Sequence, residues 1–443
     1  MQGLYTNVMG VRKIVKKIIP SSQFQKIEPL GHLGEAVLFN TAYKFPSKGM
    51  KVIGVTGTNG KTSTSFLIHR MLTEAGFKVG LLTTVAYGVG NDIKPQIHHM
   101  TNVPVPELMK RLTWMKKQKI DWLVFETTSQ GLAQHRVWGV PYSMAVMTNV
   151  THEHLDYHKT FERYVAAKRM LFEIVAKNKK GLNVGIGNAD DPNGANFANL
   201  TKNPILYGVK EGDVKAENIK LHPSGVEYDA VAPDETYHIK SHLPGSFNVY
   251  NTLAAVCAGR ALGLNKEQIE KGIAALEGVE GRMNTISEGQ DFNVIVDFAH
   301  TPDSFEILFK DMRPVVKGKM IVLFGSAGRR DEAKRGIQGG LAGKYADEVI
   351  ITEEDDRDID GQMIMNQIAE GAEKEGKIRD KNLFLVHDRT EAIKFALSRA
   401  TSKDDTVLLL GKGHEKTMEQ ANGTRRWDEI GTAHQALKDL LKK

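Results

Sequence analysis

A glycine-rich loop between an apolar strand and a helix is the feature that most constrains what this chain can fold into. The loop reads Gly54-Val-Thr-Gly-Thr-Asn-Gly-Lys-Thr62, follows the apolar pair Val52-Ile53 and precedes a helical stretch over 63–75. Glycines at 57 and 60 let successive backbone N–H groups converge on phosphate oxygens, and the helix adds the positive end of its dipole. The loop therefore predicts a nucleotide site and an enzyme that uses ATP.

The residues of this loop have separate expected roles. Lys61 is expected to reach the β and γ phosphates, and the hydroxyl of Thr62 is expected to bind Mg²⁺. The general form of the motif has glycine five residues before Gly60, where this chain has Val55, so the match is to the variant Thr-Gly-Thr-Asn-Gly-Lys-Thr. An ordinary strand-to-helix connection is the alternative, and Gly-Lys-Thr at the helix start argues against it. The predicted ATP-binding residues are Gly57, Thr58, Asn59, Gly60, Lys61, Thr62 and Ser63.

Length and composition predict a globular protein of two or three domains. The chain has 443 residues, 41% of them hydrophobic, which is enough to build buried cores. It lacks an apolar run of the ~20 residues needed to span a bilayer and the pattern of a signal peptide, so we expect a soluble cytoplasmic protein and a monomer. A formal net charge of +6 fits anionic substrates at least as well as nucleic acid, and without an aromatic-basic patch we expect no nucleic-acid partner. The single cysteine, Cys257, lies in an Ala-rich stretch and predicts a packed thiol.

Alternating strands and helices predict an α/β protein, with a central P-loop parallel-sheet ATPase domain followed by a Rossmann-like C-terminal domain. In the central domain we expect strands at 51–55, 78–83, 122–127 and 144–147, helices at 64–75, 105–118 and 249–263, and a polar strand-like region at 205–239. A second alternation follows, with strands at 294–297, 320–324, 348–352, 383–386 and 406–410. The predicted domains are a short N-terminal segment at 1–48, the central domain at 49–280 and the C-terminal domain at 281–443.

A basic amphipathic segment lies near the N-terminus. A helix over 11–19 would place Val11, Ile14, Val15, Ile18 and Ile19 on one face, with four Lys and Arg residues mainly elsewhere. Such a helix can dock on another domain or lie on an anionic membrane surface. Docking is the simpler interpretation, and membrane contact through 11–19 is the alternative.

Acidic and histidine side chains gather at the predicted strand ends. Glu126 ends the strand at 122–127, at the edge of the sheet where ligands bind in open α/β folds, and is well placed to hold Mg²⁺. The stretch Thr148-Asn-Val-Thr-His-Glu-His-Leu-Asp-Tyr-His158 adds three histidines and two acids. Such a cluster is typical of metal or phosphate binding, and the spacing of its residues does not distinguish between the two.

The ordered set of motifs resembles the Mur ligase family, specifically UDP-N-acetylmuramyl-tripeptide synthetases of the MurE type, from about residue 50 to 437. The motifs are Thr56-Gly-Thr-Asn-Gly-Lys-Thr62, Glu126-Thr-Thr-Ser-Gln-Gly-Leu-Ala-Gln-His-Arg136, Thr148-Asn149 through His154-Leu-Asp-Tyr-His158, Ala166-Ala-Lys168, Gly245-Ser-Phe-Asn248 with Asn251, Gly281-Arg-Met283, Asp297-Phe-Ala-His-Thr-Pro-Asp303 and Gly411-Lys-Gly-His-Glu415. Any one of these is a short match, and only their order makes the resemblance specific.

The resemblance implies a metal site, a nucleotide site and a reaction. Thr62 and Glu126 would hold one Mg²⁺, and His154 and a carbamylated Lys168 would hold a second. The catalytic residues that the resemblance implies are Lys61, Glu126, His154 and Lys168. Without the carbamate, Lys168 would be a solvated helix lysine. Further ATP contacts would come from Asn248, Asn251, Arg282, Asp297 and His300, with closure of the two domains around the nucleotide. A substrate carboxylate would take the γ-phosphoryl group of ATP as an acyl phosphate, which an amino group converts to an amide.

The same resemblance implies the substrates, a UDP-linked muramyl dipeptide and a diamino acid, in peptidoglycan biosynthesis. The family signature for meso-diaminopimelate is Asp-Asn-Pro-Arg, and the aligned stretch here is Thr352-Glu-Glu-Asp-Asp-Arg357. Arg357 favours diaminopimelate, the added acids favour lysine or another diamine, and an acidic loop without a role is the third interpretation. The candidate substrate-binding residues are Thr101, Asn102, Ser129, Gln134, Arg136, Arg357, Gly411 and Glu415.

Two alternatives remain open. Family members carry a further domain before the phosphate loop, where this sequence has about fifty residues, so a related ligase such as a folylpolyglutamate synthase, or a different and lipid-linked acceptor, is possible. A non-catalytic ATP-binding regulatory subunit is the second, and it would be expected to lack Lys61, Glu126, His154 or Lys168. All four are present.

Overall fold

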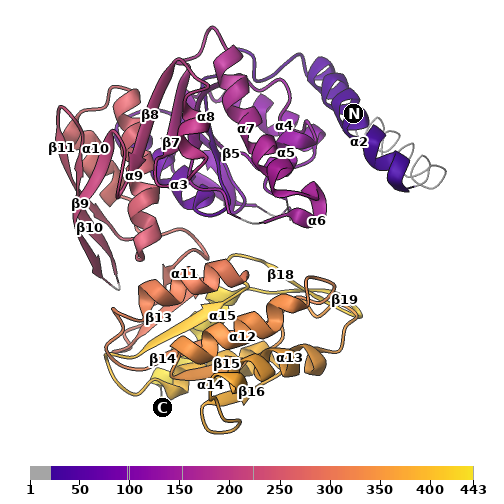
Figure 1. The fold of residues 1–443 in the computed structure, drawn as a ribbon, viewed down its shortest axis with the longest axis vertical. Coiled ribbons are helices and arrows are strands. Elements are labelled where there is room, and N and C mark those ends of the chain that lie inside the picture. The colour runs from indigo at the N-terminus through magenta and orange to yellow at the C-terminus, as the bar shows by residue number, and fades with distance from the viewer. Residues whose placement is uncertain (1–20, 97, 99, 152, 223, 443) are drawn as a thin grey trace. The chain divides into compact units, whose positions relative to one another are not determined.

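The computed structural model describes residues 21–96, 98, 100–151, 153–222 and 224–442, so the segment 11–19 lies outside the described residues. The chain forms two compact units (Figure 1). The first contains the described residues up to Ile219 together with Tyr228–Lys240 and Val249–Leu276; the second contains Lys220–Glu227, Ser241–Asn248 and Glu277 onward.

Within the described residues, an 11-stranded sheet has the order β11-β10-β9-β8-β7-β6-β1-β5-β2-β3-β4. At its centre β1 runs parallel to β5 and β6, so that their carboxyl ends meet at one edge. The strands are β1 (Val52–Thr56), β2 (Val79–Leu82), β3 (Ala86–Val89), β4 (Asp92–Pro95), β5 (Trp122–Glu126), β6 (Tyr142–Met147), β7 (Val184–Asn188), β8 (Asn203–Gly208), β9 (Val214–His222), β10 (Gly225–Val231) and β11 (Thr236–Ser241).

Helices α4 and α7 cover this sheet because each buries an apolar stripe against it. A single core cluster joins side chains of α4 and α7 with those of β1 and β5, and it includes Ala36 and Phe39 from α2. The helices are α2 (Ser21–Ala42), α3 (Lys61–Glu74), α4 (Val105–Lys117), α5 (Ser129–Ala133), α6 (Leu155–His158), α7 (Phe161–Lys177), α8 (Gly194–Ala198), α9 (Ser246–Ala261) and α10 (Lys266–Ala274). Cys257 is fully buried in α9, which confirms the packed thiol.

A second, six-stranded sheet has the order β12-β13-β17-β14-β15-β16 and is parallel from β13 to β16. Its strands are β12 (Asn284–Thr285), β13 (Asn293–Asp297), β14 (Met320–Phe324), β15 (Glu348–Ile351), β16 (Leu383–Leu385) and β17 (Thr406–Leu410), and a hairpin follows of β18 (Thr417–Gln420) and β19 (Gly423–Arg426). The helices are α11 (Pro302–Met312), α12 (Ala333–Tyr345), α13 (Gly361–Lys374), α14 (Arg389–Arg399) and α15 (Glu429–Leu441).

The two faces of this second sheet bury different helices. Alternate residues of β14 enter two core clusters: Val322 packs with α11, α12 and α13, whereas Leu323 packs with α14 and α15. The helix that follows β14 therefore lies on one face and the helix after β17 on the other. Neighbouring parallel strands whose connections leave on opposite faces mark a topological switch point, where open α/β sheets bind ligands.

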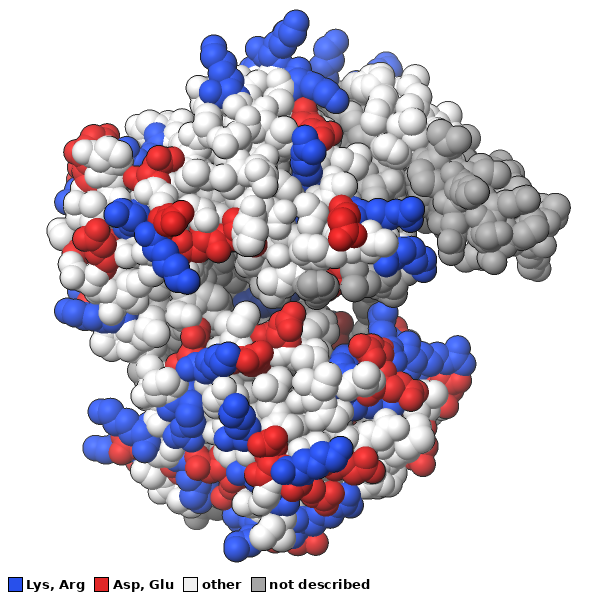
Figure 2. Space-filling model, viewed as in Figure 1, with Lys and Arg blue, Asp and Glu red and all other residues white. Residues whose placement is uncertain are grey.

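The predicted α/β class is confirmed, and so are the strands predicted in both alternations. Helix α3 begins at Lys61, three residues before its predicted start, so Lys61 and Thr62 lie in its first turn. On the face drawn in Figure 2, basic and acidic side chains are interspersed over each unit. In the part of the chain that the structure describes, no helix is long and apolar enough to cross a membrane.

Candidate active site

The phosphate loop has a backbone that only glycine adopts easily at two positions. Gly57 has φ +152° and Gly60 has φ +83°. A Cβ atom at Gly57 would lie 1.8 Å from Thr148 Oγ1, and one at Gly60 would lie 2.2 Å from Asn251 Oδ1. Both glycines are therefore required by conformation and by space, as expected for a loop that wraps closely around phosphate.

The end of β6 holds this loop in place. The backbone N–H of Thr58 donates to Asn149 O at 2.8 Å, and that of Asn59 donates to Asn149 Oδ1 at 2.9 Å. Thr148 Oγ1 donates to Asn59 O at 2.6 Å. The Thr148-Asn149 pair, quoted above without a role, therefore braces the loop, and nothing in its sequence alone would indicate this function.

Thr62 and Glu126 meet in a buried polar site beside the loop. Thr62 Oγ1 donates to Glu126 Oε2 at 3.0 Å, and Glu126 also accepts from Thr84 N at 3.0 Å and from Thr84 Oγ1 at 2.9 Å. Glu126 is 1% exposed, which excludes a solvated surface glutamate. A carboxylate beside a hydroxyl at a phosphate loop fits Mg²⁺, which prefers oxygen ligands. Lys61 Nζ lies at the same loop and donates to Thr58 O at 2.7 Å.

Lys168 is buried, which was not the expectation for an unmodified helix lysine. It is 1% exposed on α7, with Nζ donating to Gly57 O at 2.5 Å and lying 4.4 Å from the centroid of the Tyr164 ring. Burial, and then the positive charge of Lys61, hold the pKa of Lys168 well below its usual value, although Glu153 and Glu126 act in the other direction. The amine is therefore set beside the phosphate loop in an environment that favours its neutral form.

The described residues of the histidine stretch after β6 do not form a metal cluster by themselves. His154 has φ +55°, and its Nε2 lies 3.7 Å from the Glu153 carboxylate, whereas His158 Nε2 hydrogen-bonds Ser129 Oγ at 3.0 Å. Among the described residues, no group of three or more His, Cys, Asp or Glu side chains is arranged to hold a metal ion. His152 lies outside the described residues.

The candidate acceptor residues of the first unit lie around the same strand end. Asn102 Nδ2 donates to Glu126 O at 2.8 Å and Arg136 donates to Asn102 O, so these two side chains brace the carboxyl end of β5. Thr101 Oγ1 hydrogen-bonds Thr84 Oγ1 at 2.7 Å. Gln134 follows α5 and is partly exposed. The site thus brings Thr101, Asn102 and Arg136 together, with Asn102 and Arg136 engaged in backbone support.

The further predicted nucleotide residues are divided between the two units. In the first unit, Asn251 lies beside Gly60 and accepts from Thr64 Oγ1 at 3.3 Å. Asn248 belongs to the second unit and donates to Pro244 O at 2.6 Å. In the second unit, the Asp297 carboxylate accepts from Met283 N and Ala299 N, both at 2.7 Å. Burial raises the pKa of Asp297 above its usual value, although the nearby charge of Arg282 acts in the other direction.

Two aromatic contacts complete this part of the second unit. The Arg282 guanidinium lies 4.6 Å from the centroid of the Phe298 ring, and the His300 ring lies 4.6 Å from the same ring. His300 Nδ1 is 2.8 Å from Phe298 O. Arg282, Asp297 and His300 are therefore neighbours, and their roles in nucleotide binding remain a prediction.

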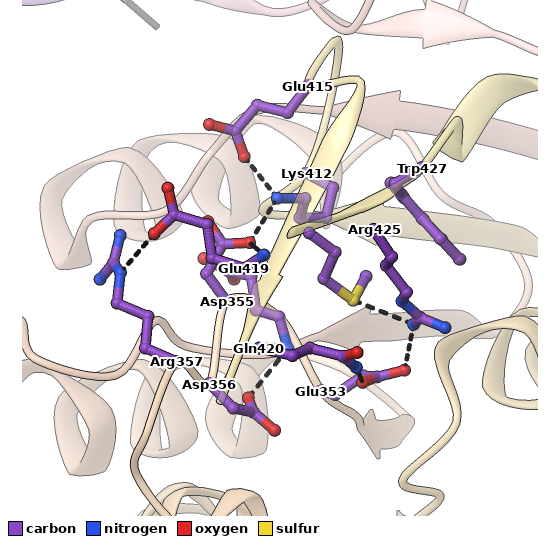
Figure 3. A network of polar contacts seen from close by, with 12 residues as sticks. Glu353, Asp355, Asp356, Arg357, Lys412, Glu415, Glu419, Gln420, Arg425 and Trp427 are labelled. Atoms are coloured by element: carbon purple, nitrogen blue, oxygen red, sulfur yellow. Dashed lines mark hydrogen bonds and ion pairs between the residues drawn. The ribbon is translucent and has the colours of Figure 1, made fainter. Parts of the chain in front are cut away.

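A polar network lies at the carboxyl ends of β15 and β17 (Figure 3). Lys412 is fully buried and donates to Asp355 at 2.9 Å and to Glu415 at 2.7 Å. Arg357 Nε donates to Glu419 Oε2 at 2.7 Å. Glu353, Glu354 and Asp356 are each at most 9% exposed, so these three acids are buried, whereas Asp358 at the end of the stretch is exposed. Gly411 and Glu415 belong to the same region, and their role in substrate binding remains a prediction.

Four further polar residues of the second unit, the buried Ser326 and Arg335 and the partly buried Lys334 and His414, were not identified as site residues from the sequence. Arg335 is fully buried; its Nη1 donates to Gln367 at 2.6 Å, and its Nε and Nη2 have no hydrogen-bond partner among the described residues. Ser326 Oγ and His414 Nδ1 are likewise without one. Burial lowers the pKa of His414 to about 3 and also lowers that of Lys334. The basic run 329–335 after β14 was the available signal for Lys334 and Arg335.

Comparison with protein families gives two consecutive matches. Residues 55–259 match the Mur ligase middle domain, and residues 281–413 match the Mur ligase, glutamate ligase domain. The chain is 37% identical to UDP-N-acetylmuramoyl-L-alanyl-D-glutamate--2,6-diaminopimelate ligase 1 of Clostridium acetobutylicum, covering 98% of this chain and 87% of that protein. It is 38% identical to the UDP-N-acetylmuramyl-tripeptide synthetase of a Roseiflexus species, covering 93% and 83%.

Solved structures agree with these matches. A UDP-N-acetylmuramoyl-L-alanyl-D-glutamate--2,6-diaminopimelate ligase is similar with a TM-score of 0.64 and 27% identity, covering 94% of this chain and 83% of that one. A folylpolyglutamate synthase of Mycobacterium tuberculosis, complexed with ADP and AMPPCP, has a TM-score of 0.67 at 15% identity, covering 93% and 95%. At that identity the second likeness extends to the fold alone.

Proposed function

This chain belongs to the Mur ligase family, and we propose that it is the ATP-dependent ligase that joins a diamino acid to a UDP-N-acetylmuramyl-dipeptide in peptidoglycan synthesis. The observation that carries the proposal is the constellation of Lys61 with the buried Thr62, Glu126 and Lys168 around one phosphate loop. A regulatory subunit without catalysis has no need to bury two ionisable side chains beside this loop. The curated relatives, 37% and 38% identical, support the substrate class.

Transfer of the phosphoryl group requires that two anions approach each other. A carboxylate oxygen of the acceptor attacks the γ-phosphorus, the bond to the bridging oxygen breaks, and ADP leaves with that electron pair. Lys61 and the N-terminus of α3 hold the phosphates and offset the repulsion. Thr62 and Glu126 would hold Mg²⁺, which supplies further charge neutralisation at the triphosphate. The amino nitrogen of the diamino acid then attacks the acyl carbon, phosphate leaves and the nitrogen loses a proton.

Lys168 fits this proposal in a carbamylated form. An ammonium cannot bind a cation, whereas a carbamate supplies anionic oxygens. Carbamate formation needs the neutral amine, because the nitrogen lone pair attacks the carbon of CO₂ before the nitrogen loses a proton. The lowered pKa of Lys168, caused by burial and by Lys61, raises the fraction of that neutral form at neutral pH.

Phosphate release from ATP tests the proposed function. The assay uses UDP-N-acetylmuramyl-alanyl-glutamate with lysine, meso-diaminopimelate, ornithine or glutamate, and each substrate is also omitted in turn. Release that requires the UDP-dipeptide together with a diamino acid is the expected result. Lys61→Met is expected to abolish it. Release that proceeds equally well without the UDP-dipeptide, or that only glutamate stimulates, contradicts the proposal and indicates a different acceptor.

A further inference from the structure

We propose that the amino edge of the first sheet is a docking surface for an anionic lipid membrane, and that eleven exposed lysines on this edge bind the lipid headgroups. The amino edge is the end of the sheet at which the parallel strands β1, β2, β5, β6, β7 and β8 begin. This surface takes no part in the proposed reaction, so its role does not depend on the identity of the substrates. The lysines are Lys44, Lys48, Lys51, Lys78, Lys116, Lys117, Lys119, Lys177, Lys179, Lys180 and Lys202.

Contacts between the loops place these lysines along one edge. The N–H of Asp121, before β5, donates to Lys78 O, before β2, at 2.8 Å. The N–H of Lys202, before β8, donates to Asn183 Oδ1, before β7, at 2.8 Å. The strand order β8-β7-β6-β1-β5-β2 makes the edge about 24 Å wide, at about 4.8 Å per strand. Helix α7 runs toward the top of the first unit in Figure 1, and Lys and Arg side chains predominate along that top in Figure 2.

The positive charge of the chain is concentrated on this edge. Asp121 is the single acid in the segments that carry the lysines, which are 44–51, 76–78, 116–121, 177–183 and 199–202. Eleven lysines and one aspartate give the edge a formal charge of +10, whereas the whole chain has +6, so the rest of the chain carries −4. Within the described part of the chain, none of the eleven side chains forms an ion pair. Their charge is therefore available to a partner of opposite sign.

The second sheet shows that strand starts in this chain are not basic in general. In the first sheet, the four residues before each of the six strands contain six lysines and one acid in total. In the second sheet, the four residues before each of β13, β14, β15, β16 and β17 contain six basic residues and five acids. There the charges compensate one another, as where Lys319 pairs with Glu348 at 3.3 Å. The excess of lysine belongs to the first sheet alone.

The residue types of the edge fit a lipid surface better than a nucleic acid. All its basic side chains are lysines, whose compact charge suits headgroup phosphates in any orientation, and its segments contain no arginine to grip a phosphate bidentately. Phe45 and Leu182 lie in the same segments and are each 38% exposed. Apolar side chains between lysines can enter the boundary between headgroups and acyl chains, whereas an aliphatic side chain such as Leu182 gains little from a phosphate backbone.

Docking through this edge leaves the active site free. The phosphate loop follows β1 and Glu126 ends β5, so both lie at the carboxyl edge of the same sheet. Each of these two strands has five residues, which separates the two edges by about 16 Å. Substrates dissolved in water therefore reach the phosphate loop while the amino edge lies on a membrane.

Co-sedimentation of the full-length protein with lipid vesicles tests the proposal. The vesicles contain phosphatidylglycerol with phosphatidylcholine, or phosphatidylcholine alone. We expect binding to the anionic vesicles only, and its loss at about 1 M salt, where charges are screened within about 3 Å. Changing Lys48, Lys180 and Lys202 together to Gln should weaken the binding about a hundredfold, the value of three lysines at an anionic surface. Changing the same three to Arg should preserve the binding, because the charge is kept.

The matched control changes Lys317, Lys381 and Lys403 to Gln, three exposed lysines that precede strands of the second sheet. This control should bind vesicles as the parent does, and Tm and phosphate release without vesicles should be unchanged in both triple variants. Absence of vesicle binding, equal binding to neutral vesicles, or equal binding by the two Gln variants overturns the proposal and leaves the ligase function standing. Tighter binding to double-stranded DNA than to anionic vesicles at equal phosphate concentration also overturns it. Failure of phosphate release would overturn the ligase function and leave the vesicle result intact.

Discussion

Gly60 has no room for a side chain in the phosphate loop. A Cβ atom there would meet Asn251 Oδ1 at 2.2 Å, and φ is +83°. We expect Gly60→Ala to weaken ATP binding more than about tenfold, because the loop must open to relieve a clash of this size. Isothermal titration with ATP and Mg²⁺ measures the change. Gly76→Ala is the matched control, because Gly76 has φ +92° with open space around it and shares only the backbone strain.

Lys168 is predicted to carry a carbamate. With ¹³C-bicarbonate, the enzyme should show a carbamate carbon signal by NMR that is absent from Lys168→Met. The variant should lose at least about a hundredfold in kcat, as expected when one stabilising group at a reacting charge is removed. Lys177→Met, which alters an exposed lysine of the same helix, should keep both the signal and the activity. A fully active Lys168→Met variant would disprove the assignment.

The sequence could predict which side chains meet in the site where the residues lie at the ends of neighbouring strands. Glu126 and Thr62 follow neighbouring parallel strands, so their meeting could be expected before the structure was known. The burial of Lys168 could not, because a lysine in a helix is ordinarily solvated. The pairing of Arg357 with Glu419 joins residues 62 positions apart through the β18–β19 hairpin, and no local pattern indicates it.

At the scale of elements, a buried ion pair connects α14 to α15. Arg389 and Glu429 are fully buried, with Nη2 to Oε1 at 2.7 Å and Nε to Oε2 at 2.9 Å. Arg389 also donates to Glu353 O and Leu410 O, and these two hydrogen bonds connect the carboxyl ends of β15 and β17 to α14. Arg389→Met should cost about 3–5 kcal/mol, because it leaves a buried carboxylate unpaired.

Urea unfolding of Arg389→Met, Glu429→Gln and the double variant measures this coupling. The double variant should recover part of the loss, since the two changes remove one shared interaction. Arg399→Met is the control on the same helix, because Arg399 is 36% exposed where it pairs with Glu348 and should cost no more than about 1 kcal/mol. Equal losses in the two single arginine variants would contradict a special role for burial.

Helix α3 buries a neutral histidine whose titration should make stability depend on pH. Burial is the main cause that lowers the pKa of His69 to about 4, from 6.5 in the unfolded chain. As the pH falls from 6.5 toward 4, His69 is protonated in the unfolded chain but stays neutral in the folded chain. Its contribution to the free energy of unfolding is therefore complete above pH 6.5 and is lost as the pH falls below 6.5. Between pH 7 and pH 5 the loss should be about 2 kcal/mol.

His69→Gln removes this titration and leaves the others in place. The free energy of unfolding should therefore fall by about 2 kcal/mol less in His69→Gln than in the parent between pH 7 and pH 5. Urea unfolding at both pH values gives the difference. An identical fall in both proteins would contradict a neutral His69 in the folded state.

The accuracy of the element predictions followed the character of each segment. Strands β1, β5, β6 and β13 to β17 are short apolar runs bounded by turns, and all were predicted from that pattern. The sequence analysis did not identify β7, which reads Val184-Gly-Ile-Gly-Asn188, because two glycines weaken the strand signal and tertiary pairing with β6 and β8 supplies what the sequence lacks. The β18–β19 hairpin was missed for a different reason, because its strands are polar and lack an apolar run.

At the scale of the whole molecule, two units with separate cores should unfold in separate steps. Three of the four tryptophans, Trp114, Trp122 and Trp138, belong to the first unit, and Trp427 belongs to the second. In Trp427→Phe, fluorescence therefore reports the first unit alone, while circular dichroism reports both. We expect two thermal transitions by circular dichroism, one of which coincides with the fluorescence transition.

A nucleotide should distinguish these two transitions. The phosphate loop and the Thr62–Glu126 pair lie in the first unit, so ADP with Mg²⁺ at 100 times its Kd should stabilise that unit by about 2.7 kcal/mol. The fluorescence transition of Trp427→Phe should rise in temperature accordingly, and Glu126→Gln should reduce the part of the rise that depends on Mg²⁺. A single transition seen by both probes would mean that the two cores unfold together. If the fluorescence transition stays in place while the other one moves, the nucleotide phosphates are held by the second unit, and the assignment of the loop is wrong.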